Sequence, residues 1–212
     1  MKPVTKILDT LEKTFGRVAV PKRARAYDML VRAQCGYPAS EDACEKGWKA
    51  LRATVGTSPD EILGAPKAKL VKAMRAGGIV PEVRAERLRA IAKRAKEGAD
   101  FADRKTLKKL PTIGDPGADK ILLFSRVLPI AAVPSNATQV PARIGIGKSL
   151  PSYAATYRSA ERALDAALPK TFDARIRAHL LLKRHGQDVC KRSRPRCELC
   201  PLTRDCDYFV TA

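Results

Sequence analysis

Four cysteines near the end of the chain follow the spacing C-x6-C-x2-C-x5-C, in the stretch CKRSRPRCELCPLTRDC. Structural cysteines are usually dispersed and inert, so this dense group predicts a metal centre held by Cys190, Cys197, Cys200 and Cys206. A structural zinc site usually joins two short knuckles, or a knuckle and a histidine pair, whereas only Cys197 and Cys200 form a knuckle here. A 4Fe–4S cluster is larger than one ion and accepts wider spacing. We therefore expect a 4Fe–4S cluster, with zinc as the alternative.

The chain also carries a large positive charge: Lys+Arg 41 against Asp+Glu 22 gives a net charge of +19 over 212 residues. Basic residues are spread from Lys2 to Arg204 rather than gathered in a tail. Such an excess repels itself unless a partner neutralises it, so we expect a polyanionic partner. No apolar run approaches the roughly 20 residues of a membrane span. With no secretory signal pattern, we expect an intracellular protein, in the cytoplasm or nucleoid of a prokaryote, and no membrane partner.

Apolar residues recur at helical spacing along almost the whole chain, without a convincing run of period two. The stretch TSPDEIL predicts a helix start with Ser58 as N-cap and Glu61 completing a capping box. The stretch RAGGIVPEVRAERL predicts a helix stop at Gly77 and Gly78 and a new helix from about Pro81. These patterns predict an all-α fold of roughly ten helices joined by short loops.

A basic loop, KRSRPR, separates the first two cysteines of the cluster. A loop closed at both ends has already lost much of its entropy, so phosphate contacts made by its cations cost less ordering. We therefore expect DNA or RNA backbone contacts here, although a solvated charged loop is the alternative. The predicted contacts are Lys191, Arg192, Arg194 and Arg196. The remaining cysteines, Cys35 and Cys44, are expected to be small core residues.

A second motif, LKKLPTIGDPGADKILLF at residues 107–124, has the form helix, glycine-containing turn, helix. Asp115 is predicted to cap the second helix, with Pro116 at its first position. The backbone N–H groups of such a turn and helix start bind a phosphate without reading sequence. The predicted contacts are Thr112, Ile113, Gly114 and Gly117.

Together the two motifs resemble the helix-hairpin-helix DNA glycosylases with an iron–sulfur cluster, the endonuclease III and adenine glycosylase family. The cluster loop of that family has the same cysteine spacing, and its hairpin reads L-P-G-V/I-G, matched by LPTIG with Thr112 in place of a glycine. The segment VRAQCGYP is similar to the family's LSAQ or LSQQ segment. The resemblance thus puts Gln34 where the family has a glutamine that enters the gap left by a flipped nucleotide. LLKRHGQDVCKRSRPRC is similar to the family's helix leading into the cluster.

The resemblance covers most of the chain, from about Arg25 to Cys206. It implies an all-α protein of two domains: a six-helix domain at 22–133, with the helix-hairpin-helix at about 107–124, and a cluster domain at 1–21 plus 134–212. It implies a 4Fe–4S cofactor, and double-stranded DNA, damaged or abasic, lying across the cleft. The protein is expected to act as a monomer.

Both catalytic positions of the family depart from its pattern. The lysine of bifunctional members, which forms a Schiff base, corresponds to Pro116. The catalytic aspartate, in an ungapped reading from Leu110, corresponds to Pro134, where the flanking Val133 and Ser135 fit well. Proline offers neither a free amine for an imine nor a carboxylate for an oxocarbenium ion. We therefore expect both catalytic side chains to be missing.

Weak replacements lie in the same helix: Lys120, Asp115 and Asp119. Each also has an ordinary role to offer, as a phosphate contact, a helix cap and a first-turn dipole partner respectively. Ile79 or Val80, in the turn after the glycine stop, is a candidate apolar wedge between bases, or otherwise part of the joint between helices.

Two functions therefore stay open, and with them the question of whether the chain is an enzyme. The first is a DNA-repair protein of the endonuclease III-like superfamily that binds duplex DNA and flips a damaged base. As an N-glycosylase, a hydrolase, it would excise slowly or be monofunctional, with no β-lyase activity. The alternative is a catalytically inactive damage- or structure-specific DNA-binding protein on the same fold. A redox protein is a weaker third reading, because the charge and the hairpin would have no purpose.

Overall fold

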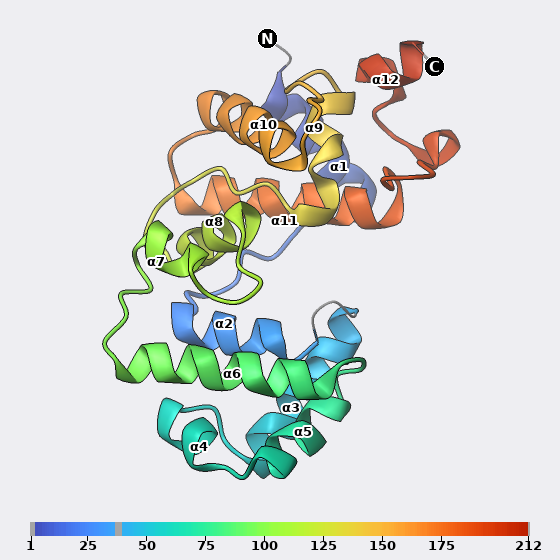
Figure 1. The fold of residues 1–212 in the computed structure, drawn as a ribbon. Helices are drawn as coiled ribbons and strands as arrows, with labels where there is room; N and C mark the ends of the chain where they lie inside the picture. Colours follow the sequence, from blue (N-terminus) through green and yellow to red (C-terminus); the bar gives the residue numbers. More distant parts are fainter. Residues whose placement is uncertain (1–2, 37–39, 212) are drawn as a thin grey trace. The chain divides into compact units, whose positions relative to one another are not determined.

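The computed structural model describes residues 3–36 and 40–211, and every regular element in these ranges is helical (Figure 1). The predicted all-α fold is therefore confirmed. Tyr37 and Pro38 of the glutamine segment lie outside the described residues. None of the described helices is both long and apolar enough to cross a membrane.

The chain packs as two compact units, Ala24–Ile113 and the combination of Met1–Arg23 with Gly114–Ala212. The packing division falls inside the hairpin motif, between Ile113 and Gly114. The domain prediction placed its boundary after Val133 instead, and that assignment stays a prediction. Residues from both ends of the chain contribute to one unit.

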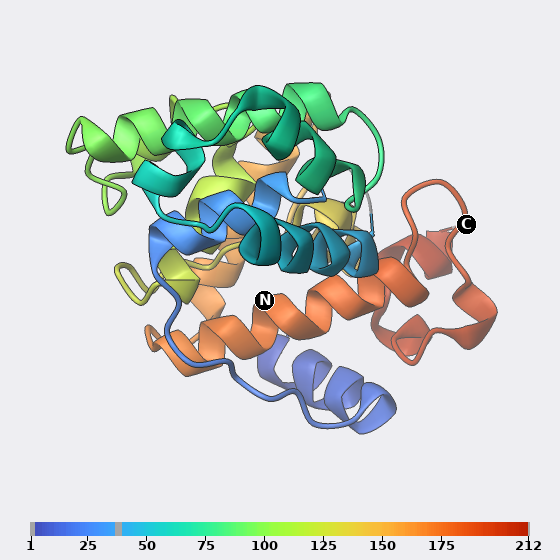
Figure 2. The same ribbon diagram turned by 90° about the horizontal axis from the view of Figure 1, so that it is seen from below.

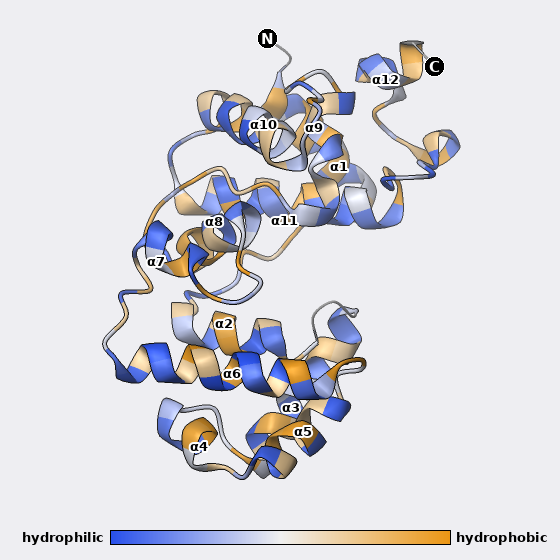
Figure 3. Ribbon diagram, viewed as in Figure 1, coloured by the Kyte–Doolittle hydropathy of each residue, from blue (hydrophilic) through white to orange (hydrophobic). Residues whose placement is uncertain are grey.

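The unit Ala24–Ile113 is built around α6, which packs against α2, α4 and α5, while α3 packs against α5. Figure 3 shows hydrophilic and apolar positions alternating along α6, as expected of a helix buried on one side. Its helices are α2 (Ala26–Gln34), α3 (Glu41–Thr54), α4 (Pro59–Gly64), α5 (Lys67–Arg75), α6 (Pro81–Lys96) and α7 (Arg104–Lys108).

Local signals set the helix ends in this unit as predicted. Ser58 Oγ accepts the Glu61 amide at 3.3 Å, and Glu61 Oε2 accepts the Ser58 amide at 2.9 Å, which completes the capping box. Helix α5 ends at Arg75, before the glycine pair, and α6 begins at Pro81. Val80, the N-cap of α6, has a left-handed backbone with φ 48°.

The other unit centres on α11, which packs against α1, α8 and a short 3-10 helix, η1 (Figure 2). Helix α1 buries Val4, Ile7, Leu8 and Leu11, the i, i+3, i+4, i+7 pattern of an amphipathic helix. The α-helices are α1 (Val4–Phe15), α8 (Asp115–Phe124), α9 (Gln139–Arg143), α10 (Tyr153–Ala167), α11 (Phe172–Asp188) and α12 (Asp207–Thr211). The 3-10 helices are η1 (Ser135–Ala137), η2 (Cys197–Leu199) and η3 (Thr203–Asp205).

Candidate functional site

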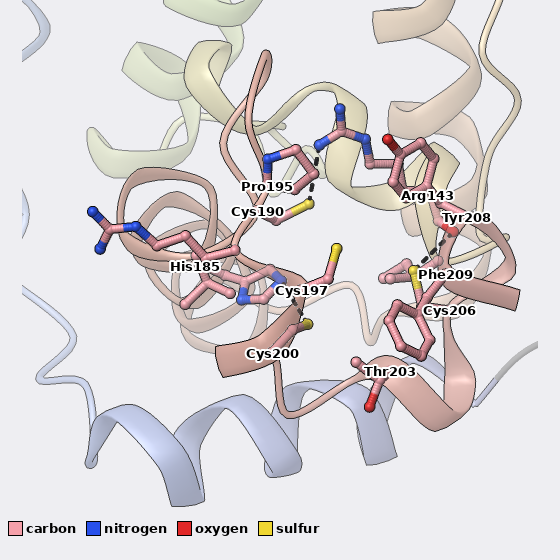
Figure 4. A pocket seen from close by; sticks show the side chains of 13 residues that line it. Arg143, His185, Cys190, Pro195, Cys197, Cys200, Thr203, Cys206, Tyr208 and Phe209 are labelled. Atoms are coloured by element: carbon pink, nitrogen blue, oxygen red, sulfur yellow. Dashed lines mark hydrogen bonds between the residues drawn. The ribbon is translucent and has the colours of Figure 1, made fainter. Parts of the chain in front are cut away.

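The four predicted ligands meet at one site. The end of α11 and the segments that carry η2 and η3 bring Cys190, Cys197, Cys200 and Cys206 to the wall of a common cavity (Figure 4). Among the residues that the structure describes, none that lines this cavity carries a carboxylate. Within the described ranges no three His, Cys, Asp or Glu side chains are grouped closely enough to hold a single ion. The four sulfurs instead border a shared space, and such an all-thiol donor set fits the ligands of a 4Fe–4S cluster.

Burial shapes the chemistry of these thiols. It raises the pKa of Cys190, an effect that the nearby Arg143 guanidinium opposes. It also raises the pKa of Cys200, where the hydrogen bond from the Leu202 amide acts in the opposite direction. Raised pKa values keep free thiols protonated at neutral pH, so their conversion to thiolates depends on a bound metal.

Arg143 links α9 to the start of the cysteine loop, a role that sequence reasoning missed. Its Nη1 donates to Cys190 Sγ at 3.4 Å and to the Lys191 carbonyl at 2.8 Å, and its Nη2 donates to the Arg192 carbonyl at 2.7 Å. The guanidinium also lies 4.8 Å from the centre of the Tyr208 ring. Because these contacts cross 47 to 49 residues of sequence, no local pattern could have indicated them.

His185 is a second residue near the cysteines, and it is fully buried in α11. Its Nε2 lies 3.9 Å from Cys200 Sγ (Figure 4), while its Nδ1 has no hydrogen-bond partner among the described residues. The ring is therefore placed to contact the sulfur of a ligand, a contact that tunes metal sites in general.

The basic loop is closed on itself, as predicted from its sequence. The amides of Lys191 and Arg196 both donate to the carbonyl of Val189, each at 2.9 Å. Lys191 is half-buried, whereas Arg192, Arg194 and Arg196 are exposed. The cations of this loop therefore project from a backbone whose two ends are fixed next to the cysteine site.

The hairpin motif differs from its prediction in one detail. Helix α8 begins at Asp115, and the capping position is Gly114, which offers no side chain. Asp115 is therefore not the cap, because the extended backbone of Gly114 starts the helix one residue earlier than predicted. Thr112, Gly114 and Lys120 are exposed and Gly117 is half-buried, whereas Ile113 is buried, so its side chain is not presented to a partner.

Thr112 itself has a left-handed backbone with φ 64°. A β-branched residue in this region is strained by about 1–2 kcal/mol, and the hairpin pattern of the resembled family has glycine here. The Thr112 hydroxyl donates to the Pro111 carbonyl at 2.6 Å and accepts from Gln34 Nε2 at 3.2 Å. Gln34 ends α2 and is only 1% exposed, so the structure brings these two predicted DNA contacts together.

The turn before α6 presents the predicted wedge residues to solvent: Ile79 is 63% exposed and Val80 is 44% exposed. The alternative, that these residues form the core of a helix joint, is therefore not what the structure shows. Their backbone is held by Arg84, which donates from Nε to the Ile79 carbonyl at 2.9 Å and from Nη2 to the Gly78 carbonyl at 2.8 Å.

Arg84 is fully buried, and it also binds the ends of two helices, a role no sequence pattern signalled. Its guanidinium donates to the Cys35 carbonyl at 2.6 Å, after α2, and to the Met74 carbonyl at 2.5 Å, in the last turn of α5. The carbonyls at helix C-termini carry partial negative charge, which offsets the cost of burying this cation. A methyl group on Gly77 would lie 1.7 Å from the Cys35 oxygen, so only glycine fits beside this junction.

Two endonuclease III proteins are similar to this chain in sequence. That of Rickettsia conorii is 27% identical over 191 residues, 86% of this chain and 84% of the relative. That of Treponema pallidum is 28% identical over 185 residues, 85% of this chain and 82% of the relative. No family model matches the chain.

Solved structures agree on the fold over the full length. A trapped endonuclease III–DNA covalent intermediate matches with a TM-score of 0.76 at 21% identity, covering 100% of this chain and 99% of that one. A thermostable thymine-DNA glycosylase matches with a TM-score of 0.78 at 19% identity, covering 99% and 98%. In sequence and in fold the chain is similar to the helix-hairpin-helix DNA glycosylase superfamily. Its sequence relatives named above are endonuclease III proteins.

Two prolines occupy the positions that the resemblance assigns to catalytic side chains. Pro116 is half-buried in the first turn of α8, and Pro134 is buried as the N-cap of η1, with φ −63° and ψ 138°. Lys120 is exposed, and its charge adds to burial in lowering the pKa of His179 to about 4. The ring of the buried His179 contacts the Ala132 carbonyl at 2.9 Å.

Asp119 has a structural role different from the predicted first-turn dipole partner. Its carboxylate is 0% exposed and accepts a hydrogen bond from the buried Tyr157 hydroxyl at 2.7 Å. Burial, followed by the Asp119 charge, raises the pKa of Tyr157, so this hydroxyl remains a donor at any physiological pH. A carboxylate enclosed in this way is not open to a substrate sugar or to water.

Proposed function

We propose that this chain is a DNA-repair protein that binds duplex DNA at damaged or abasic positions and displaces the nucleotide at the lesion. Any base excision is slow, proceeds by hydrolysis, and is not followed by β-elimination. The observation that carries this proposal is the combination of an intact four-cysteine site, which closes a basic loop, with proline at both catalytic positions. The cysteine site and basic loop proposed to bind DNA are thus present, whereas proline replaces the side chains expected to react with it.

A 4Fe–4S cluster fits the four cysteines, and Cys190, Cys197, Cys200 and Cys206 would each ligate one corner. Such a cluster supplies an internal cross-link and a centre for one-electron transfer. The residues around it then have separate tasks: Arg143 orients the first ligand and the loop backbone, and the loop cations contact phosphates. Because phosphate contacts carry no sequence information, this part of the surface provides affinity rather than choice of lesion.

The side chains of Ile79, Val80 and Gln34 support recognition of an opened duplex. The exposed Ile79 and Val80 form an apolar tip of the kind that separates stacked bases. Gln34 lies on a helix end that Arg84 fixes through the Cys35 carbonyl. An apolar tip beside a polar amide suits a gap in which one base has left the stack.

The second candidate function, a damage-binding protein without any excision, is favoured by the environment of the altered positions. Pro134 is buried, and Asp119, one of the two candidate replacement acids, is sealed against Tyr157. Loss of a general acid or base typically lowers the reaction rate about 10²- to 10⁴-fold. Excision would then be too slow to matter, and DNA binding would be the whole function.

A panel of lesion duplexes tests these proposals. We expect tighter binding of an abasic or damaged duplex than of the intact duplex, a slow product revealed only by hot alkali, and no strand cleavage without alkali. Equal affinity for every duplex would contradict damage recognition. Alkali-labile product above the background of the protein-free reaction separates the slow enzyme from the inactive binding protein.

Borohydride treatment with an abasic duplex tests the absence of lyase chemistry, because it traps an imine as a stable cross-link. We expect no cross-link. A cross-link would reveal a relocated amine, and Lys120→Ala and Lys183→Ala would identify it. Lys183 is included because partial burial lowers its pKa, which raises the fraction of neutral, nucleophilic amine at neutral pH.

A further inference from the structure

The Gln34 side chain is held in a defined orientation by Thr112, 78 residues further along the chain. The Thr112 hydroxyl donates its single hydrogen bond to the Pro111 carbonyl. A lone pair of the hydroxyl oxygen therefore accepts the hydrogen bond from Gln34 Nε2. This network fixes which end of the amide faces the hairpin. Nε2 points to Thr112, and Oε1 is left on the other side.

This arrangement leaves part of the hydrogen-bonding capacity of the Gln34 side-chain amide unused. A glutamine side chain has two N–H donors and an oxygen with two lone pairs. In the part of the chain that the structure describes, Gln34 Oε1 is shielded from solvent and has no hydrogen-bond partner. Buried polar groups without partners are costly, and Thr112 adds backbone strain at the same contact. The observed state is therefore one that a better set of partners would displace.

The backbone around Gln34 leaves the side chain as the part that moves. The next residue, Cys35, is fixed by the Arg84 guanidinium on its carbonyl, and Gly77 packs against the same oxygen. Thr112 is exposed, so the contact that holds the amide lies at the molecular surface. Release requires only rotation of side-chain torsions, which is fast compared with backbone rearrangement.

We propose that Thr112 is a positioning residue that holds Gln34 in a parked state and releases it into a gap in the DNA stack. This inference rests on the proposed function in damage recognition. The exposed base edges that border a gap carry hydrogen-bond donors and acceptors able to pair with both ends of the amide. An intact duplex offers no such space. The hydrogen bond to Thr112 therefore lowers affinity only for DNA with a gap that Gln34 can enter. The size of this decrease is set by the fraction of protein molecules in which Gln34 is parked.

The test compares Thr112→Val with Thr112→Ser. Valine keeps the β-branched shape and the strain but removes the acceptor, whereas serine keeps the acceptor. Affinity is measured for a duplex with a tetrahydrofuran abasic analogue and for the matched intact duplex. We expect Thr112→Val to raise the ratio of affinity for the abasic duplex to affinity for the intact duplex about 2- to 10-fold, because one hydrogen bond no longer favours parking. Thr112→Ser is expected to restore the lower ratio.

The role of Gln34 is tested in the same assay. The gain in affinity of Thr112→Val for the abasic duplex is expected to disappear in the double variant with Gln34→Ala. That variant has no amide side chain at position 34 that Thr112 could hold. A gain that persists in the double variant, or that extends equally to the intact duplex, would overturn the proposal and would mean that position 112 meets DNA directly. A 2-aminopurine opposite the abasic analogue reports entry of Gln34 into the gap as a fluorescence change.

A measurement without DNA separates failure of the parked state from failure of the proposed function. The side-chain amide of Gln34 is expected to exchange slowly with solvent in the native protein and in Thr112→Ser, and fast in Thr112→Val, by NMR. Fast exchange in the native protein would overturn the parked state whatever the protein does with DNA. Slow exchange without any preference of the native protein for the abasic duplex would overturn the proposed function, and with it release by DNA.

Discussion

The cysteine site and the two positions that the resemblance assigns to catalytic side chains belong to the same packing unit but differ in their fit to the resembled family. The cysteine site has all four thiols, a closed basic loop, and Arg143 bridging Cys190 to the loop backbone. The two expected catalytic positions hold Pro116 and Pro134, and Asp119 is locked to Tyr157. The contacts that shape the proposed DNA-binding loop are many and distributed, whereas the expected chemistry depends on two side chains.

This difference has a physical cause. Removing one cysteine would leave three of the four predicted ligands, and the segment beyond α11 has little regular structure of its own beyond short 3-10 turns and α12. Proline at position 134 costs the fold little, because the position is an N-cap whose φ of −63° suits proline. The two regions therefore tolerate substitution very differently.

The largest expected effect comes from breaking the cysteine site. Cys197→Ala or Cys200→Ala should abolish binding of about four iron atoms per chain and the visible charge-transfer absorption. Iron analysis and absorption spectra after anaerobic purification measure this. Cys44→Ala is the matched control, because Cys44 lies in the other unit, where its thiol contacts only the Arg32 carbonyl among the described partners. Stoichiometric zinc without iron in the native protein would contradict the cluster assignment.

The second effect comes from restoring the family pattern at the catalytic positions. Pro134→Asp, alone or with Pro116→Lys, should raise excision of a lesion base by at least about 10²-fold if only the catalytic groups are missing. The backbone of Pro134, extended at ψ 138°, accepts aspartate, which is also a favoured N-cap. Single-turnover glycosylase assays measure the gain, and Pro134→Asn is the control of equal shape without the charge.

The opposite outcome of this experiment is equally informative. If Pro134→Asp folds and binds DNA with native affinity but gains no activity, the pocket itself has changed. That result would favour the damage-binding protein over the slow enzyme. Thermal unfolding of both variants checks that the fold is retained.

The sequence predicted those features that depend on near neighbours in the chain. The cysteine spacing, the capping box of Ser58 and the glycine stop before Pro81 each involve residues within a few positions of one another. The local error concerned Asp115: α8 starts one residue earlier than predicted, with the extended backbone of Gly114 as its cap. The polar pattern alone does not distinguish these two starts.

The features that sequence reasoning missed are long-range. Asp119 was expected to be a dipole partner in the first turn of its helix, but its partner Tyr157 lies 38 residues away, and α8 buries residues on more than one face. In the sequence, Arg84 cannot be distinguished from the other basic residues of α6. Its role depends on contacts with the ends of α2 and α5, which only the fold brings together. The parked contact of Gln34 requires the exact position of Thr112, which no periodicity encodes.

The smallest expected effect concerns the basic loop, and it tests whether the retained region holds DNA as proposed. Replacing Arg192, Arg194 and Arg196 together by Ala should leave iron content unchanged, because these side chains are exposed and the loop is closed by backbone hydrogen bonds to Val189. If each arginine neutralises one phosphate, the slope of log affinity against log salt should become less steep by up to about 2.7, at about 0.9 per contact.

Affinity at moderate salt should fall about 10-fold in this triple variant, since three exposed charge contacts at about 0.5 kcal/mol each sum to one factor of ten. The control is a triple variant with the same loss of charge elsewhere, Lys6, Lys13 and Lys22 to Ala, all of which are exposed. A general effect of net charge would flatten the slope equally in both proteins. A change confined to the loop variant would show that the cysteine site keeps its place because it positions phosphate contacts. No change in either would mean that the loop is only a solvated cover over the cysteines, and that DNA is held by the hairpin and the α2 and α6 segments instead.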